Sequence, residues 1–431
     1  MNLTPKSLRL HIGLFGRTNV GKSSFLNLVA GQDVAIVSKV PGTTTDVVET
    51  PMELLPLGPV VFLDTAGVDD SSELAGLRLA KTRKIFDRSE VVAIVLEAES
   101  WTGFEDGILA EAAARSVPVI LVVNKIDLKA PSGEYIAMLK QKSPRVITCS
   151  SIDLAGRDGY LTAFKQHLLE ACPEEFLAPP PLMADLLSSG NGIGMAVLVV
   201  PIDLQAPRGR LILPQVQAIR DCLDSDAAVA VVKEREYPAL LKKLAAPPEI
   251  TVCDSQVVLK VVGDTPPGVP CTTFSILFAR NKGDLAEMAR GAAVLTDIGP
   301  GDRILIAEAC SHHAIEDDIG RVKIPRWIRQ YAGTDVAIDT CAGRDYPEDL
   351  DRYRLVIHCG GCMITRREML SRIEAARRAG VAVTNYGVAI SALQGVIERT
   401  LAPFPAALDA FQREREKIRG RARVAAAGAV R

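Results

Sequence analysis

Two short segments in the last third of the chain combine thiol and imidazole side chains at close spacing. They are Cys310-Ser311-His312 and His358-Cys359-Gly360-Gly361-Cys362, and they hold three of the nine cysteines and two of the five histidines. Thiolates and imidazoles are the ligands that soft and borderline metals prefer. Three thiolates suit a [4Fe–4S] cluster with one iron left for a weaker or exchangeable ligand, whereas three cysteines and a histidine suit structural Zn²⁺. The pattern predicts a metal site with Cys310, Cys359 and Cys362 as ligands and with His312 and His358 as further candidates.

A second motif, G-x-x-x-x-G-K-S, lies near the N-terminus at residues 16–23. It follows a buried strand expected at residues 8–15 and precedes an apolar helix expected to begin at Phe25. In such a loop the glycines let main-chain N–H groups curl around phosphates, and the helix N-terminus adds partial positive charge. Lys22 is expected to reach the β- and γ-phosphates of a nucleotide, and the Ser23 hydroxyl is expected to bind Mg²⁺.

Three further segments, each after an expected strand, indicate which nucleotide binds. In Asp64-Thr65-Ala66-Gly67, Asp64 can hold the Mg²⁺ shell through water and the N–H of Gly67 can meet the γ-phosphate. In Asn124-Lys125-Ile126-Asp127, the Asp127 carboxylate can accept the N1–H and 2-amino protons of guanine, a pair that adenine lacks. Ser150-Ser151 fits a loop that backs the base. The four motifs in this order predict GTP binding.

Residues 8–173 resemble the TrmE-Era branch of translation-factor-like GTPases. The resemblance implies that Thr44, in Pro41-Gly42-Thr43-Thr44-Thr45-Asp46, is the second Mg²⁺ ligand and that Asn19 helps to bind K⁺ beside the phosphates. Val68 stands where Ras-like enzymes have a water-positioning glutamine, so hydrolysis needs other assistance, which K⁺ could give. Loop capping is the alternative role of Asn19. The expected catalytic residues are Lys22, Thr44 and Gly67, and the expected nucleotide-binding residues are Gly16, Asn19, Gly21, Lys22, Ser23, Ser24, Thr44, Asp64, Gly67, Asn124, Lys125, Asp127, Ser150 and Ser151.

The composition suits a globular protein of several domains. Its 431 residues are too many for one ordinary core and suggest about three domains. The net charge of −2 offers no basic surface to nucleic acid or membranes, and no run of 18 apolar residues or signal-peptide pattern occurs. An odd number of scattered cysteines argues against a disulfide framework. We therefore expect a cytoplasmic protein that binds neither nucleic acid nor a membrane.

Two proline-rich segments, residues 173–181 and 264–270, divide the chain. The first domain is therefore expected at residues 8–173. Alternating strands and helices over residues 182–264, with strands expected at 196–200, 227–232, 250–252 and 257–262, predict a small α/β domain. No chemistry-bearing motif occurs in it, which makes it a candidate for subunit association.

Residues 271–402 form the expected third domain. Residues 403–431 form a basic tail, which we expect to be a frayed helix. Expected strands at 303–307, 335–339, 355–357 and 382–384, with a helix at 367–378, predict a parallel, Rossmann-like sheet. The carboxyl ends of parallel strands meet at one edge, so the two cysteine segments should lie close together although 45 residues separate His312 from His358. Cys341 ends another of these strands and is interpreted as a free buried thiol. The fold class is thus α/β throughout.

The order of GTPase domain, small α/β domain and C-x-H…H-C-x-x-C domain resembles the [FeFe]-hydrogenase maturation GTPases of the HydF family, to about residue 402. The resemblance implies a homodimer or higher oligomer that holds a [4Fe–4S] cluster. It also implies a scaffold that carries a diiron precursor, made with two radical-SAM maturases, to apo-[FeFe]-hydrogenase, with GTP hydrolysis as a switch for partner binding. The alternative is an RNA- or ribosome-linked GTPase with a structural zinc domain, and a third class is an iron–sulfur redox sensor that uses GTP as a signal.

Overall fold

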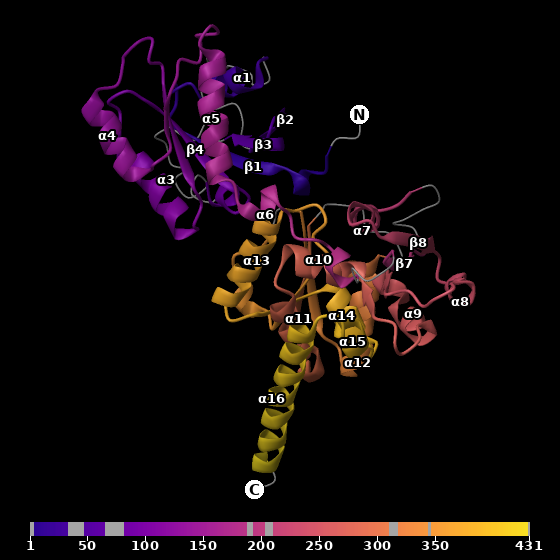
Figure 1. Cartoon of the computed structure of the whole chain (residues 1–431). Helices are drawn as coiled ribbons and strands as arrows, with labels where there is room; N and C mark the ends of the chain where they lie inside the picture. Colours follow the sequence, from indigo (N-terminus) through magenta and orange to yellow (C-terminus); the bar gives the residue numbers. More distant parts are fainter. Residues whose placement is uncertain are drawn as a thin grey trace. The chain divides into compact units, whose positions relative to one another are not determined.

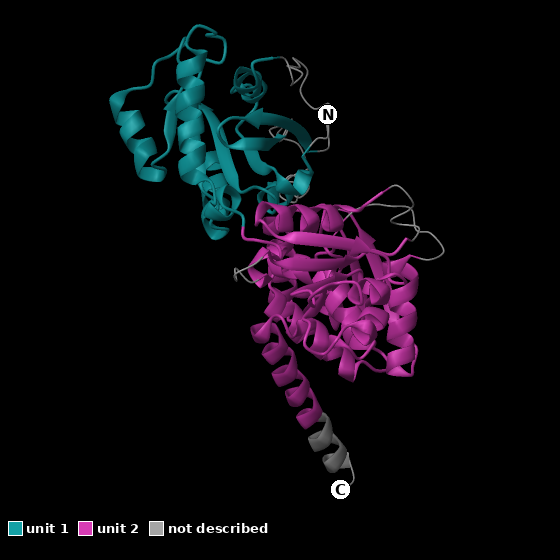
Figure 2. Ribbon diagram, turned by 45° about the vertical axis from the view of Figure 1, so that its right-hand side comes forward, with its two compact units in different colours: residues 1–179 teal, residues 180–431 magenta. Residues whose placement is uncertain are grey.

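The computed structural model describes residues 4–32, 47–64, 82–187, 193–202, 210–309, 318–343 and 346–429 (Figure 1). Four residues that the sequence singles out, Thr44, Gly67, Cys310 and His312, lie outside the described residues. The chain forms two compact units, Met1–Pro179 and Pro180–Arg431 (Figure 2).

The first unit is a six-stranded sheet with the order β2-β3-β1-β4-β5-β6. Its β2 runs antiparallel to β3, and the other neighbouring strands are parallel. The strands are β1 (Leu10–Phe15), β2 (Val48–Leu54), β3 (Gly58–Asp64), β4 (Val91–Glu97), β5 (Val119–Asn124) and β6 (Val146–Thr148). The helices are η1 (Lys6–Leu8), α1 (Lys22–Ala30), α3 (Gly103–Ala114), α4 (Gly133–Lys142), α5 (Arg157–Ala171) and α6 (Glu174–Leu177).

Helices cover both faces of this sheet, which explains the continuous apolar runs of its central strands. Ile12 of β1 packs with Phe25 of α1 and Phe164 of α5 on one face, and the two phenylalanine rings meet edge to face with centroids 5.2 Å apart. Phe15 of β1 packs with Leu139 of α4 on the other face. The carboxyl ends of β1, β3, β4, β5 and β6 consequently meet at one edge of the sheet.

The second unit contains two parallel four-stranded sheets. The first sheet has the order β10-β9-β7-β8. Its strands are β7 (Met195–Val199), β8 (Ala228–Val232), β9 (Ile250–Cys253) and β10 (Cys271–Thr273). The helices of this part are η2 (Ala184–Leu186), α7 (Leu213–Asp224), α8 (Tyr237–Leu241), η3 (Ser255–Val257) and α9 (Val258–Asp264).

Residues 257–262 are helical, so the strand that we predict there from its β-branched residues is wrong. The Asp254 carboxylate accepts the N–H of Gln256 at 3.0 Å and starts the helical segment. Val258 and Val261 are fully buried whereas Leu259 is 56% exposed, which is the spacing of a helix that packs on one side.

The other sheet of this unit has the order β12-β11-β13-β14. Its strands are β11 (Arg303–Glu308), β12 (Ala337–Ala342), β13 (Leu355–His358) and β14 (Ala382–Asn385), all at the positions that the sequence predicts to within a few residues. The helices are α10 (Phe274–Lys282), α11 (Leu285–Ala293), η4 (Val294–Asp297), η5 (Ile319–Lys323), α12 (Ile324–Ala332), η6 (Leu350–Arg352), α13 (Arg366–Arg378), α14 (Tyr386–Leu393), α15 (Ile397–Leu401) and α16 (Pro405–Ala429).

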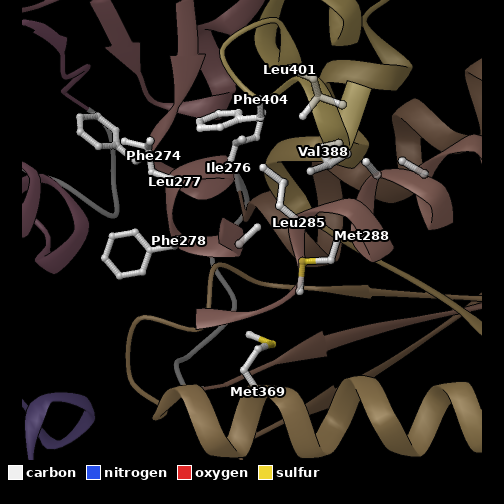
Figure 3. Packing of buried hydrophobic residues seen from close by; sticks show 14 of the residues in the cluster. Phe274, Ile276, Leu277, Phe278, Leu285, Met288, Met369, Val388, Leu401 and Phe404 are labelled. Atoms are coloured by element: carbon white, nitrogen blue, oxygen red, sulfur yellow. The ribbon is translucent and has the colours of Figure 1, made fainter. Parts of the chain in front are cut away.

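The two sheets of the second unit share one hydrophobic core. Phe274 and Phe278 of α10 belong to the same cluster as Leu198 of β7 and Val356 of β13, and Figure 3 shows α10 among its apolar neighbours. We predict residues 271–273 in the third domain, but the structure pairs them with β9 in the first sheet. No linker follows β10, because α10 begins at the next residue.

The C-terminal tail is the long helix α16, whose first turns pack against α11 (Figure 1). Ala407 and Phe411 are 3% and 2% exposed and anchor it to the core. Within the described part of the chain, no helix is both long and apolar enough to cross a membrane.

Candidate functional site

The loop between β1 and α1 has the backbone shape that its glycines allow. Gly16 and Gly21 have φ angles of 150° and 94°, and a Cβ atom at these positions would come within 2.3 Å of the Val95 carbonyl oxygen and 2.4 Å of the Asn124 side chain. The Lys22 ammonium donates to the carbonyl oxygens of Gly16 at 2.6 Å and Arg17 at 2.9 Å. The lysine thus lies across its own loop, with its charge directed at the loop interior.

Arg17 ties this loop to α3, a contact that our sequence analysis misses. Its Nε donates to the Glu105 carboxylate at 2.9 Å and its Nη2 donates to the Ser100 carbonyl oxygen at 2.8 Å. Glu105 is fully buried and also accepts the N–H of Thr102 at 2.8 Å, which completes the capping box of α3. The T-x-x-E pattern at residues 102–105 is the sequence signal for the helix start, although it does not reveal the partner.

The residues predicted to bind guanine are hydrogen-bonded in pairs to one another and to the phosphate loop. Asn124 is buried, donates to the Val20 carbonyl oxygen at 3.0 Å and accepts the N–H and hydroxyl of Ser151 at 3.1 and 2.9 Å. The Ser150 hydroxyl donates to the Asp127 carboxylate at 2.5 Å. The Lys125 ammonium donates to the Asn19 carbonyl oxygen. The end of β3 carries Asp64, which is 5% exposed. The described motif residues are therefore gathered at the carboxyl edge of the sheet.

The strand that precedes the first cysteine segment, β11, is paired with the strand that precedes the second, β13. Ala307 of β11 is paired with His358 of β13. Just beyond this pair, the Cys359 N–H donates to the Ala307 carbonyl oxygen at 2.8 Å, and the Ala309 N–H donates to Cys359 Sγ at 3.1 Å. The chain that leads to Cys310 therefore contacts Cys359 directly.

The loop from Cys359 to Cys362 turns tightly, and a buried lysine donates hydrogen bonds to its carbonyl oxygens. Gly361 has a φ angle of 64°, and a Cβ atom there would lie 2.4 Å from the Met369 side chain. Lys282 at the end of α10 is 3% exposed, and its ammonium donates to the carbonyl oxygens of Gly361, Cys362 and Ile364 at 3.2, 3.2 and 2.8 Å. Burial lowers the pKa of Lys282 to about 8, against the opposite effect of the two cysteines.

His358 has both ring nitrogens engaged in hydrogen bonds. Its Nδ1 lies 2.9 Å from the Cys359 carbonyl oxygen, and its Nε2 lies 3.0 Å from Arg372 Nη1. Since arginine only donates, Nε2 accepts and Nδ1 carries the proton. Burial, aided by the charge of Arg372, lowers the pKa of His358 to about 3. In this arrangement both ring nitrogens are engaged in hydrogen bonds that hold the loop, and the ligand role of His358 stays a prediction.

The remaining donors near the cysteine loop have partners of their own. Glu308 is 2% exposed and accepts from Arg321 at 2.9 Å and from the Tyr386 hydroxyl at 3.4 Å. Cys341 is half-buried on β12, opposite Ala307, and burial raises its thiol pKa. Considering only the described residues, no group of three or more His, Cys, Asp and Glu side chains could hold a metal. The half-buried Cys359 and Cys362, with an N–H directed at sulfur and a glycine turn between them, have the chemistry of thiolate ligands.

The fold and its loops define the class of this protein, a P-loop GTPase with an appended two-sheet unit that bears cysteines. Residues 11–125 match the family described as 50S ribosome-binding GTPase. Residues 182–283 match the Hydrogen maturase F dimerization domain, and residues 286–403 match the Hydrogen maturase F tetramerization domain. The last two matches together cover about half of the chain. The chain belongs to the hydrogen maturase F family, as its sequence pattern predicts.

The chain therefore carries a GTPase domain followed by two domains whose descriptions, dimerization and tetramerization, support a homo-oligomer. The segment described as a tetramerization domain is the one that contains Cys310, Cys359 and Cys362.

Known relatives of the first unit include the tRNA modification GTPase MnmE. The chain is 37% identical to MnmE of Koribacter versatilis over 183 residues, which cover 37% of this chain and 38% of that protein. It is 30% identical to MnmE of Paraburkholderia xenovorans over 249 residues, 52% of this chain and 50% of that protein. The chain thus spans half or less of the length of these relatives. Among solved structures, a variant of Era from Aquifex aeolicus bound to GDP.AlF4- aligns with a TM-score of 0.33 and 19% identity, over 55% of this chain and 98% of that chain.

Proposed function

We propose that the protein is a GTP-dependent scaffold and carrier in hydrogenase maturation. It holds a [4Fe–4S] cluster on Cys310, Cys359 and Cys362, and it carries a diiron precursor, made with two radical-SAM maturases, to apo-[FeFe]-hydrogenase. The observation that carries the proposal is the contact of the Ala309 N–H with Cys359 Sγ at 3.1 Å. This contact brings the residue before Cys310 against the second predicted ligand. When bound, the cluster supplies an iron with an exchangeable coordination position.

The engagement of His358 favours three thiolates over a site of three cysteines and this histidine. Its Nδ1 is hydrogen-bonded to the Cys359 carbonyl oxygen and its Nε2 to Arg372. Releasing Nε2 would leave a buried guanidinium N–H without its acceptor, which is costly. A ligand set of three thiolates leaves one iron of a cluster open, as a carrier requires, whereas Zn²⁺ needs a fourth protein ligand in a closed structural site.

In the first unit, Lys22 neutralises the β- and γ-phosphates and Ser23 binds Mg²⁺. Asp64 holds the Mg²⁺ shell through a water molecule. The loop geometry supports these roles, because Lys22 donates to the Gly16 carbonyl oxygen and the loop takes a backbone shape that only glycine allows at positions 16 and 21. Asp127 binds the guanine edge and is oriented by Ser150. Thr44 and Gly67, which lie outside the described residues, complete the Mg²⁺ shell and contact the γ-phosphate.

Potassium assists hydrolysis through Asn19. This residue has a left-handed backbone, with a φ angle of 65°, and its carbonyl oxygen is held by Lys125. Asparagine tolerates this conformation better than most residues, and its side chain is exposed beside the phosphate loop. A monovalent cation there takes the place of the charge that an arginine finger supplies in other GTPases.

Hydrolysis of GTP acts as the switch that changes partner binding, and the product of the pathway is the loaded hydrogenase. Loss of the γ-phosphate removes the contacts of Thr44 and Gly67, which is how GTPases of this fold change the shape of a surface. The protein works as a homodimer or higher oligomer in the cytoplasm.

Anaerobic purification followed by absorption and EPR spectroscopy tests the proposal, together with iron, sulfide and zinc analysis. We expect about four iron and four sulfide per chain after reconstitution. Zinc without iron would overturn the proposal and favour the RNA- or ribosome-linked GTPase with a structural zinc domain. Co-expression with apo-[FeFe]-hydrogenase then separates a carrier from a redox sensor, because only a carrier is required for active hydrogenase.

A further inference from the structure

We propose that Lys282 is the built-in counter-charge of the cysteine loop and that it sets both the shape of the loop and the reduction potential of the cluster. This inference rests on the proposed iron–sulfur function. Lys282 is a positioning residue, because its ammonium donates to main-chain carbonyl oxygens of the loop.

The number of acceptors indicates that Lys282 is an ammonium. Its nitrogen lies 3.2, 3.2 and 2.8 Å from the carbonyl oxygens of Gly361, Cys362 and Ile364. An ammonium has three N–H donors and matches three acceptors, whereas a neutral amine has only two. These three oxygens follow Cys359 on one turn of chain, so the single side chain fixes the turn that brings Cys362 back toward Cys359.

The surroundings of Lys282 make its charge costly without a negative partner. It is 3% exposed, and its nitrogen lies 5.5 Å from the centroid of the Phe278 ring. Main-chain carbonyl oxygens carry no net charge, and a buried cation needs opposite charge nearby. The acidic groups close enough to act on it are Cys362, Cys359 and Glu368. Two of these three are predicted cluster ligands, which supply negative charge when they bind as thiolates.

This arrangement has a direct electrochemical consequence. Reduction adds one negative charge to the cluster, and a fixed positive charge nearby stabilises the reduced form. With the charge of Lys282 removed, the ratio of reduced to oxidised cluster at a fixed ambient potential should fall by on the order of tenfold. The loop should also lose order, because three buried carbonyl oxygens lose their donors.

The test is an anaerobic redox titration followed by EPR on the full-length protein, with Lys282→Met, Lys282→Arg and the exposed control Lys243→Met. We expect a lower potential and a lower iron content for Lys282→Met. Lys282→Arg should recover the potential because it keeps the charge, and Lys243→Met should behave as the wild type. A purely structural role would lower the iron content of Lys282→Met without changing the potential of the cluster that remains, and that outcome overturns the inference.

If Lys282→Met does not fold, as judged by circular dichroism, Lys282→Gln serves as the neutral variant, because it keeps two N–H donors. The same fall in potential is expected, and an unchanged potential again overturns the inference. If the wild-type protein itself takes up no iron, it is the proposed function that fails. If the wild type is loaded and the neutral variant has the same potential, only the role of Lys282 fails.

Discussion

The main-chain N–H of Ala309 lies 3.1 Å from Sγ of Cys359, although 50 positions of sequence separate the two residues. β11 and β13 are adjacent parallel strands, so Ala309, which follows the first strand, lies beside Cys359, which follows the second. An N–H directed at a sulfur stabilises negative charge on it, which suits a thiolate that binds metal. Because β11 and β13 are neighbours in the sheet, a main-chain N–H that follows one strand can reach the thiol that follows the other.

Replacement of Cys359 by serine should abolish the cluster. Its sulfur accepts the N–H of Ala309, the residue before Cys310, and a cluster that loses one of three thiolates is poorly held. Iron content after reconstitution should fall to less than about a fifth of the wild-type value. Cys341→Ser is the matched control, because Cys341 ends the neighbouring strand β12 and is expected to bind no iron. Equal iron loss in both variants would contradict the assignment of the ligands.

Replacement of His358 by alanine should destabilise the second unit and leave its metal stoichiometry unchanged. The substitution removes the acceptor of Arg372 Nη1 in a buried place, which costs about 1–3 kcal/mol of unfolding free energy. Urea unfolding of the apoprotein measures this loss, and iron analysis of the folded fraction measures the stoichiometry. His167→Ala, on the surface of α5, provides the control. Loss of iron with unchanged stability would identify His358 as a ligand.

Asp127→Asn should change the preferred base from guanine to xanthine. The carboxylate, held by Ser150, can accept two protons from guanine, whereas an amide offers one acceptor and one donor. Xanthine has an oxygen where guanine has its 2-amino group, so the amide can donate to it. GTP affinity should fall about 5- to 150-fold, since the one mismatched hydrogen bond costs about 1–3 kcal/mol. Competition binding with GTP and XTP measures the change. Asp158→Asn, whose side chain is 99% exposed, should bind GTP normally.

GTP hydrolysis should be faster in KCl than in NaCl at equal ionic strength, and Asn19→Ala should remove most of the difference. The reason is the position of Asn19 beside the phosphate loop, with its backbone held by Lys125. An increase of roughly tenfold or more in kcat is expected if K⁺ supplies the missing positive charge in the transition state. Single-turnover phosphate release is the measurement. Equal rates in the two salts would leave Asn19 with a capping role only.

Much of the GTPase unit could be predicted from the sequence, because its chemistry uses contiguous segments. A phosphate loop binds phosphate through its own main-chain N–H groups, so the residue types at positions 16–24 are enough to predict its conformation. The contact of Arg17 with Glu105 could not be predicted, because 88 positions of sequence separate the two residues. The sequence also does not distinguish a buried partner of Arg17 from an acidic residue on the surface. The helix at residues 257–262 could not be predicted either, because a short run of β-branched residues is compatible with both helix and strand. The side on which the run is buried decides between them.

The sequence by itself determined the family, and it predicted the nucleotide and the cysteine ligands Cys359 and Cys362. Only the tertiary structure decided what surrounds them. His358 stands next to Cys359 in sequence, yet its ring turns toward Arg372 on α13. Lys282, about 80 positions away, reaches the loop from α10. Both outcomes depend on which helices pack beneath the strand ends, and that packing is set by the burial of many apolar side chains together rather than by any local motif.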